Sequence, residues 1–208
     1  MFHLVTFLVA GFALVLQFVL IWQGHKAVEV AHGDSGPDLP TRIVRYFSYL
    51  TIWANGLVAW SSAMLALGRD RDTPWSRALR LDTLALIALA GVVHFFFLRP
   101  LLDLHGSDWV ADKLLHMVVP VLAAAGWALF GPRGRAHVAD LPRFLVIPVA
   151  WIVYTLVRGP FVDWYPYPFI DVDQHGYGLV ALNATGISVI LLVLAFATIW
   201  LDRKMPQE

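Results

Sequence analysis

The amino-acid sequence predicts an all-α membrane protein: one integral membrane domain over residues 1–208, built as a six-transmembrane-helix bundle. The first reason is composition, because 59% of the residues are hydrophobic and only 14% are charged, against about 25% charged in soluble domains. So few charges could not cover the apolar surface of a water-soluble fold of this size. The second reason is the presence of six apolar stretches near the roughly 20 residues that a membrane-crossing helix needs.

The expected helices are joined by short connections and closed by Arg, Lys, Asp, Gly or Pro. In chain order they are about 4–23, 43–67, 79–99, 111–130, 143–159 and 178–200. The first run, from Leu4 to Trp22, lacks the basic leader and the small-x-small cleavage site of a signal peptide. We therefore expect it to be retained as a helix.

The distribution of Lys and Arg predicts the orientation. With six helices, both termini and the second and fourth loops share one side. That side carries nine basic residues: Arg69, Arg71, Arg77, Arg80, Arg133, Arg135, Arg143, Arg203 and Lys204. The other side carries six: Lys26, Arg42, Arg45, Arg99, Lys113 and Arg158. Because cytoplasmic loops are enriched in Lys and Arg, we expect a multi-pass protein of the plasma membrane with both termini in the cytoplasm.

Charge and cysteine content exclude several classes of function. The formal net charge is 0, so nucleic acid is not an expected partner. The chain contains no cysteine, which excludes disulfides and thiol catalysis. Membrane lipid is the expected partner of a domain embedded in the bilayer.

The second expected helix carries a polar face. Ser48, Thr51, Asn55 and Ser62 are three, four and seven residues apart, a spacing that places them on one side of a helix. Polar side chains within a membrane face protein or a cavity rather than lipid. This face is either a contact between helices or part of a site.

The fourth expected helix gives the sharper signal. Asp108, Asp112, His116 and Pro120 recur every four residues, again on one face. Asp112 is placed to accept a hydrogen bond from the His116 imidazole, which would fix its tautomer and raise its basicity. Pro120 removes the helical hydrogen bond to the carbonyl of His116 and predicts a kink there.

The remaining helices add polar groups at a similar depth. At 1.5 Å per residue, His94, His116 and Asn183 lie about 6–8 Å below the outer boundary, and Thr51 lies roughly 9–13 Å below it. Arg158 ends the fifth helix. Polar groups from five helices therefore meet in the extracytoplasmic leaflet, beneath the aromatic loop Trp164–Asp171, which is either an interfacial belt or the rim of a cavity.

A hydroxyl and a histidine on facing helices suggest nucleophilic attack on an acyl carbon. Thr51 or Ser48 would attack, and His116 would take the proton. The oxyanion would be stabilised by one of three side chains, Arg158, Asn55 or Asn183; alternatively, Arg158 would hold a substrate carboxylate. A metal hydrolase would draw its ligands from five residues, His94, His116, Asp112, His105 and His175, but no ligand pair such as H-E-x-x-H is present. A haem between His94 and His116 and a transporter are further alternatives. No metal or cofactor is expected.

The chain resembles a family of six-helix membrane proteins, that of the androgen-induced gene product and the androgen-dependent tissue-factor-pathway regulator, and in particular its bacterial branch. The resemblance is carried by Arg45–Asn55, Ala111–Pro120, and Arg158–Gly159 followed by Tyr165–Val172. It implies a threonine hydrolase that cleaves fatty-acid esters of hydroxy fatty acids.

The residue roles follow from the same motifs. The family threonine follows an aromatic-Leu pair, which corresponds to Thr51, and the family histidine precedes a proline, which corresponds to His116. The spacing from this histidine to the proline is one residue shorter here than in the eukaryotic members. We therefore expect a lipid-ester hydrolase with Thr51 as nucleophile and His116 as base, supported by Ser48, Asn55, His94, Asp112, Arg158 and Asn183. The alternative is a non-catalytic membrane protein that binds or transports a small lipid or other hydrophobic ligand.

Overall fold

The computed structural model describes residues 1–25 and 36–205, and 83% of these residues are helical. They contain no strand, which confirms the predicted all-α class. The elements are α1 (Phe2–Trp22), α2 (Leu39–Ser48), α3 (Leu50–Ala66), α4 (Pro74–Val93), η1 (His94–Leu98), η2 (Arg99–Leu101), α5 (Gly106–Lys113), η3 (Leu114–Val118), α6 (Val119–Phe130), η4 (Val138–Asp140), α7 (Leu141–Phe144), α8 (Val146–Val162), η5 (Pro168–Ile170) and α9 (Val172–Lys204).

Within the described part, five helical segments are long and apolar enough to cross a membrane. They are Phe2–Trp22, Pro74–Leu101, Gly106–Phe130, Val138–Val162 and Val172–Lys204. Four of them run beyond the expected apolar stretches, because hydropathy marks the middle of a helix whereas capping groups set its ends. The Thr73 hydroxyl, for example, accepts a hydrogen bond from the Ser76 backbone N–H (3.2 Å), which starts α4 five residues before the expected helix.

The helix expected over 43–67 is divided in two. Tyr49 has an extended backbone (φ −73°, ψ 128°) and separates α2 from α3. The 17 residues of α3 are apolar but fewer than in the five long segments. The division places Thr51 in the first turn of a helix rather than in the middle of one.

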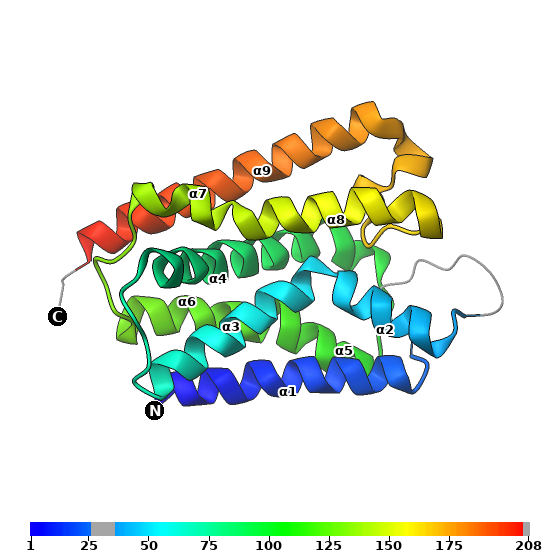
Figure 1. The fold of residues 1–208 in the computed structure, drawn as a ribbon. Helices are drawn as coiled ribbons and strands as arrows, with labels where there is room; N and C mark the ends of the chain where they lie inside the picture. The colour runs from blue at the N-terminus through cyan, green and yellow to red at the C-terminus, as the bar shows by residue number, and fades with distance from the viewer. Residues whose placement is uncertain (26–35, 206–208) are drawn as a thin grey trace.

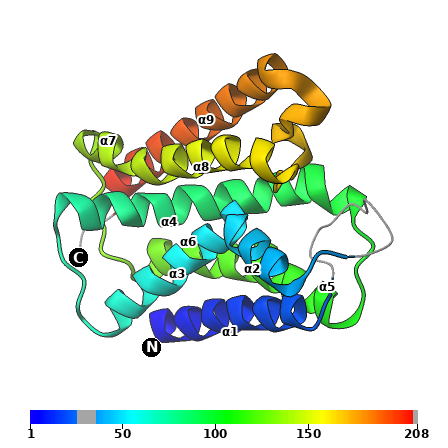
Figure 2. The same ribbon diagram turned by 45° about the vertical axis from the view of Figure 1, so that its right-hand side comes forward.

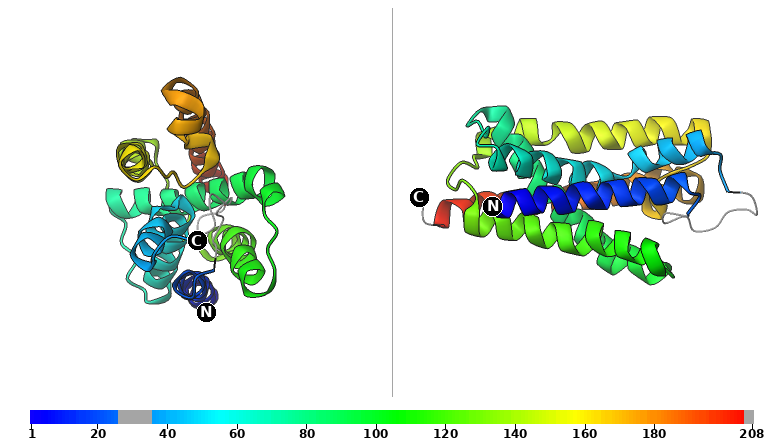
Figure 3. Two further views of the ribbon diagram at one scale, coloured as in Figure 1. Left: turned by 90° about the vertical axis from the view of Figure 1, so that its right-hand side faces the viewer. Right: turned by 90° about the horizontal axis from the view of Figure 1, so that it is seen from below.

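The long helices run side by side, and both chain termini lie at the same end of the bundle (Figure 1). The core helix is α4, which contacts α3, α6 and α9. Figures 2 and 3 show α8 and α9 on one side of α4, and α1, α3 and α6 on the other. On α4 the buried side chains include Leu81, Ala85, Leu86 and Leu89.

The outer faces of the long helices are apolar. Val5, Phe12 and Val15 on α1 are exposed, as are Val153 and Val157 on α8. A soluble monomer rarely exposes large contiguous apolar areas. This surface supports a protein embedded in a membrane.

Ion pairs close the end of the bundle that holds the termini. The Arg77 guanidinium binds Asp140 (2.7 Å) and Asp72 (3.2 Å), and Asp70 binds Arg80 at 2.8 Å. The hydrogen bond from Arg77 holds the pKa of the Asp72 carboxyl below its usual value. These contacts tie the start of α4 to the loops before α4 and before α7.

Candidate functional site

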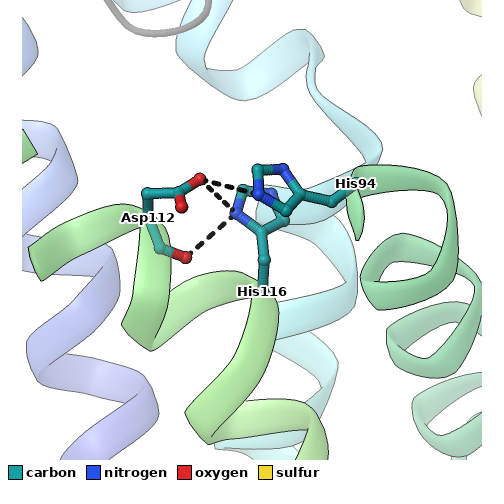
Figure 4. Close-up of side chains that lie close together, drawn as sticks. All are labelled: His94, Asp112 and His116. Atoms are coloured by element: carbon teal, nitrogen blue, oxygen red, sulfur yellow. Dashed lines mark hydrogen bonds and ion pairs between the residues drawn. The ribbon is translucent and has the colours of Figure 1, made fainter. Parts of the chain in front are cut away.

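Two histidines and an aspartate meet toward the opposite end of the bundle (Figure 4). His116 Nδ1 lies 3.1 Å from Asp112 Oδ1 and 3.1 Å from the Asp112 backbone oxygen. His94 Nε2 lies 3.1 Å from the same Oδ1. The two imidazole rings stack with centroids 3.8 Å apart and planes 8° apart. One carboxylate oxygen therefore faces both histidines.

The Asp112 carboxylate has close polar partners at both oxygens, whereas His94 lacks an aligned hydrogen bond. The second carboxylate oxygen of Asp112 binds Lys113 Nζ at 3.0 Å. His94 is 1% exposed, and neither of its ring nitrogens has an aligned hydrogen-bond partner in the structure as described. Its Nε2 thus pairs with Asp112 Oδ1 by distance, but the N–H direction is not aligned for a hydrogen bond. Buried polar groups are normally hydrogen-bonded, so His94 is an exception.

Both histidines lie in π-helical turns. The Arg99 N–H bonds the carbonyl of His94, and the Val119 N–H bonds the carbonyl of Leu114, each five residues back. Such turns are rare and occur frequently at functional sites. The π turn around His116 ends two residues before Pro120, which cannot donate the next helical hydrogen bond.

Asn55 joins this turn to α3. The Val119 N–H is bound to Leu114, and Pro120 has no N–H, so the carbonyl of Leu115 lacks a partner within the helix. Asn55 Nδ2 donates to that carbonyl (3.3 Å) and to the carbonyl of Thr51 (2.8 Å). Asn55 is 0% exposed, and its amide group links α3 to η3 by hydrogen bonds.

Thr51 lies at the second position of α3. Its backbone N–H is one of the donors that a helix leaves unpaired at its start, and it bonds the hydroxyl of Tyr167 (3.3 Å). The Thr51 Oγ1 is 3.4 Å from the same hydroxyl. The positive end of the α3 dipole therefore points toward Thr51. Burial raises the pKa of Tyr167, so its phenol stays protonated at neutral pH.

One cavity includes Thr51, Asp112, His116 and Tyr167. The rest of its wall is formed by Gln17, Tyr46, Tyr49, Ile52, Leu98, Leu104, Asp108 and Leu115. Within the described chain, no hydrogen bond joins Thr51 directly to His116. The lining combines aliphatic side chains with a small number of converging polar groups, as ligand sites commonly do.

One residue of the aromatic loop, Tyr167, lines this cavity. Tyr165 and Tyr167 are buried rather than interfacial, which favours the cavity-rim interpretation for this part of the loop. Tyr165 packs against Gly159 so closely that a Cβ there would overlap its ring. In the pair Arg158–Gly159, the glycine therefore leaves room for the ring of Tyr165.

Five of the expected site residues do not line the cavity: Ser48, Asn55, His94, Arg158 and Asn183. The contacts of Asn55 and His94 are given above. The Ser48 hydroxyl bonds the carbonyl of Val44 (2.7 Å) and the hydroxyl of Tyr154 (2.8 Å). Arg158 stacks on Trp164, with its guanidinium carbon 5.6 Å from the ring centroid. Asn183 donates to the backbone of Phe169 (2.8 Å). Each has a structural contact that sequence spacing does not reveal.

The structure brings together three of the candidate metal ligands but leaves no space for a haem between the two histidines. Of the five histidine and aspartate ligands considered, the structure gathers three, His94, Asp112 and His116, with ligand atoms within 4.8 Å of one another. His105 is exposed and pairs with Asp103, and His175 is also exposed. The stacked rings of His94 and His116 leave no room for a porphyrin between them.

Sequence reasoning missed two participants. Tyr167 was visible only as one of several loop aromatics, and Gln17 as a single polar residue in the first apolar stretch. The signal for Tyr167 was the pair of prolines, Pro166 and Pro168, which hold the chain extended on both sides of it.

Comparisons with known proteins identify no relative of this chain. No family model matches it, and searches of curated proteins and of solved structures find no match. The interpretation of the site therefore depends on its geometry.

Proposed function

We propose that the protein is an intramembrane threonine hydrolase of lipid esters, with Thr51 as nucleophile and His116 as general base. One observation carries the proposal: Thr51 and His116 line the same cavity while Asp112 binds the far side of the imidazole. Hydrolytic triads on unrelated folds use a nucleophile, a base and an orienting acid. The contact between His116 and Asp112 matches that of base and acid, and the proposal requires Thr51 Oγ1 to reach His116 when substrate is bound.

The hydrogen bonds of His116 determine its chemistry. Nδ1 faces two oxygens of Asp112, so it carries the proton, as assigned from these contacts. Nε2 then holds the lone pair of a general base. The Thr51 hydroxyl attacks the acyl carbon, and its proton passes to Nε2. The same proton then goes to the departing alkoxide, leaving an acyl-threonine that a water molecule hydrolyses to fatty acid and free Thr51.

The start of α3 supports the oxyanion. Thr51 is near the positive end of the helix dipole, and the protonated Tyr167 hydroxyl lies beside Thr51 Oγ1. The Tyr167 hydroxyl lies 3.4 Å from Thr51 Oγ1, where it can donate to the negative charge that develops next to the nucleophile. Asn55 and Asn183 hold backbone carbonyls instead, so we assign the oxyanion role to Tyr167.

The substrate is a membrane lipid ester, and the resemblance described above indicates fatty-acid esters of hydroxy fatty acids. The apolar cavity walls include Ile52, Leu98, Leu104 and Leu115. They suit acyl chains, which dissolve in the bilayer and reach the site from the side.

The proposed topology has six spans, with both termini in the cytoplasm of a plasma-membrane protein. The 17 residues of α3 extend about 25 Å at 1.5 Å per residue, and α2 continues the same pass. A periplasm-restricted thiol reagent would react with a cysteine placed at Asp171. Protection of that cysteine in intact cells would refute the orientation.

An alkyl fluorophosphonate probe tests the chemistry, because it reacts only with an activated hydroxyl. We expect wild type to label and both Thr51→Ala and His116→Ala to lose labelling. Ser48→Ala is the matched hydroxyl control and should label normally, since Ser48 lies outside the cavity. Equal labelling of wild type and Thr51→Ala would favour the alternative, a non-catalytic protein that binds or transports a small lipid.

A further inference from the structure

The cluster of His94, Asp112 and His116 has the composition of a metal site. Two imidazoles and one carboxylate are a ligand set that Zn²⁺ and related divalent transition metals use. Zn²⁺ holds nitrogen and oxygen ligands at about 2.0–2.2 Å in tetrahedral geometry, which places ligand atoms about 3.3–3.5 Å apart. Each histidine nitrogen lies 3.1 Å from Asp112 Oδ1, close to that spacing.

His94 supplies an independent observation. The cavity wall includes Asp112 and His116 but not His94, and the hydrolytic mechanism gives His94 no step. Yet His94 is buried, its Nε2 points at Asp112, and neither ring nitrogen has an aligned hydrogen bond among the described residues. A buried imidazole nitrogen that lacks an aligned hydrogen bond destabilises the fold. A metal ion beside Asp112 would use its Nε2 lone pair.

The surroundings suit an ion with one open coordination position. Three protein ligands with a fourth position left open are typical of catalytic rather than structural zinc sites, because a water molecule or substrate takes the fourth position. The π-helical turns at His94 and His116 widen the backbone where both ligands begin. The rings now stack at 8°, so ligation requires each ring to tilt toward Asp112 Oδ1.

We propose that His94 Nε2, Asp112 Oδ1 and His116 Nδ1 form a binding site for one divalent transition-metal ion of the Zn²⁺ class. Binding at Nδ1 leaves the neutral His116 ring with its proton on Nε2. That nitrogen can no longer accept the proton of Thr51. The ion is therefore an inhibitor of the proposed hydrolase, whereas the metal site itself does not depend on the hydrolase.

Zinc titration of the full chain in detergent tests the site directly. The protein should carry an affinity tag without histidine and be stripped with a chelator. Isothermal titration with ZnCl₂ should show about one ion per chain. His94→Phe keeps an aromatic ring against His116 but removes the ligand, so Zn²⁺ affinity should fall more than about tenfold, a loss seen even for outer-shell partners.

The matched control is the same substitution at an exposed histidine, His105→Phe, which should leave Zn²⁺ affinity unchanged. Asp112→Asn provides a second variant that removes the ligand charge and keeps the side-chain shape. A wild type that binds no Zn²⁺, or a His94→Phe variant that binds it as tightly as wild type, would overturn the site. Circular dichroism of each variant verifies the fold.

Fluorophosphonate labelling with and without Zn²⁺ separates the two proposals. Loss of labelling on Zn²⁺ addition, absent in His94→Phe, supports inhibition. Zinc binding with unchanged labelling overturns the inhibitory role. Normal labelling without any zinc binding would refute the metal-site proposal alone. Zinc binding without labelling under any condition would refute the hydrolase proposal alone.

Discussion

Replacing Asp112 by Asn removes the negative charge behind His116, a charge that also faces Lys113 Nζ and His94 Nε2. Asn has the same shape, and its oxygen still accepts from Nδ1, as the backbone carbonyl at 3.1 Å also does. The tautomer of His116 is therefore retained in part. What is lost is the difference between a charged and a neutral hydrogen bond, about 1–2 kcal/mol. Because 1.36 kcal/mol corresponds to a tenfold rate change, we expect fluorophosphonate labelling about 5–30 times slower.

The measurement is the labelling rate constant under excess probe, for wild type, Asp112→Asn and His116→Ala in parallel. Thermal unfolding of each variant shows whether the fold is intact. A rate within twofold of wild type would mean that Asp112 does not act through His116. A loss as complete as that of His116→Ala would show that the backbone carbonyl does not hold the tautomer.

Three further substitutions test other parts of the structure. Gly159→Ala forces the buried ring of Tyr165 to move, and overpacking of this kind costs about 1–3 kcal/mol, so Tm should fall by several degrees; Gly178→Ala, where a Cβ meets open space, is the control and should not lower Tm. Asp82 is buried on α4, and neither carboxylate oxygen has a hydrogen bond in the part of the chain described. Asp82→Leu should therefore raise the free energy of unfolding by about 1–3 kcal/mol and raise Tm; an unchanged or lower Tm would mean that Asp82 has a stabilising partner. Tyr167→Phe removes the proposed oxyanion donor and should slow labelling about 10²-fold with helicity unchanged by circular dichroism; an unaltered rate would remove Tyr167 from the mechanism.

The sequence predicts the helical class and the approximate position of each long helix, because both depend on composition summed over about 20 residues. It also predicts the contact between Asp112 and His116, which depends only on helical periodicity. The pairing of His94 with Asp112 requires knowing how α4 and η3 approach each other. Gly91 permits that approach, since a Cβ there would lie 3.3 Å from the carbonyl of His116.

The division of the second helix is harder to foresee. Tyr49 is neither Gly nor Pro, so no local signal ends α2 there. The backbone groups that the break leaves unpaired form hydrogen bonds with distant side chains. Trp151 Nε1 donates to the carbonyl of Ser48 (2.9 Å), and the hydroxyl of Tyr167 accepts a hydrogen bond from the N–H of Thr51. The donor, Trp151, is 103 positions from Ser48, and the acceptor, Tyr167, is 116 positions from Thr51. Tertiary contacts, not propensity, therefore decide where α3 begins.

The polar face of the second helix and the proline of the fourth belong to one structural arrangement. Pro120 and the π turn leave the carbonyl of Leu115 unpaired within its helix, and Asn55 donates to it from α3. The same amide group binds the carbonyl of Thr51. A contact between helices and a candidate site are thus compatible interpretations of this face, because the buried amide that joins the helices also fixes the distance between the start of α3 and the turn of His116. Asn55→Leu would remove that link, and we expect it to impair labelling through the spacing of Thr51 and His116 while both side chains remain present.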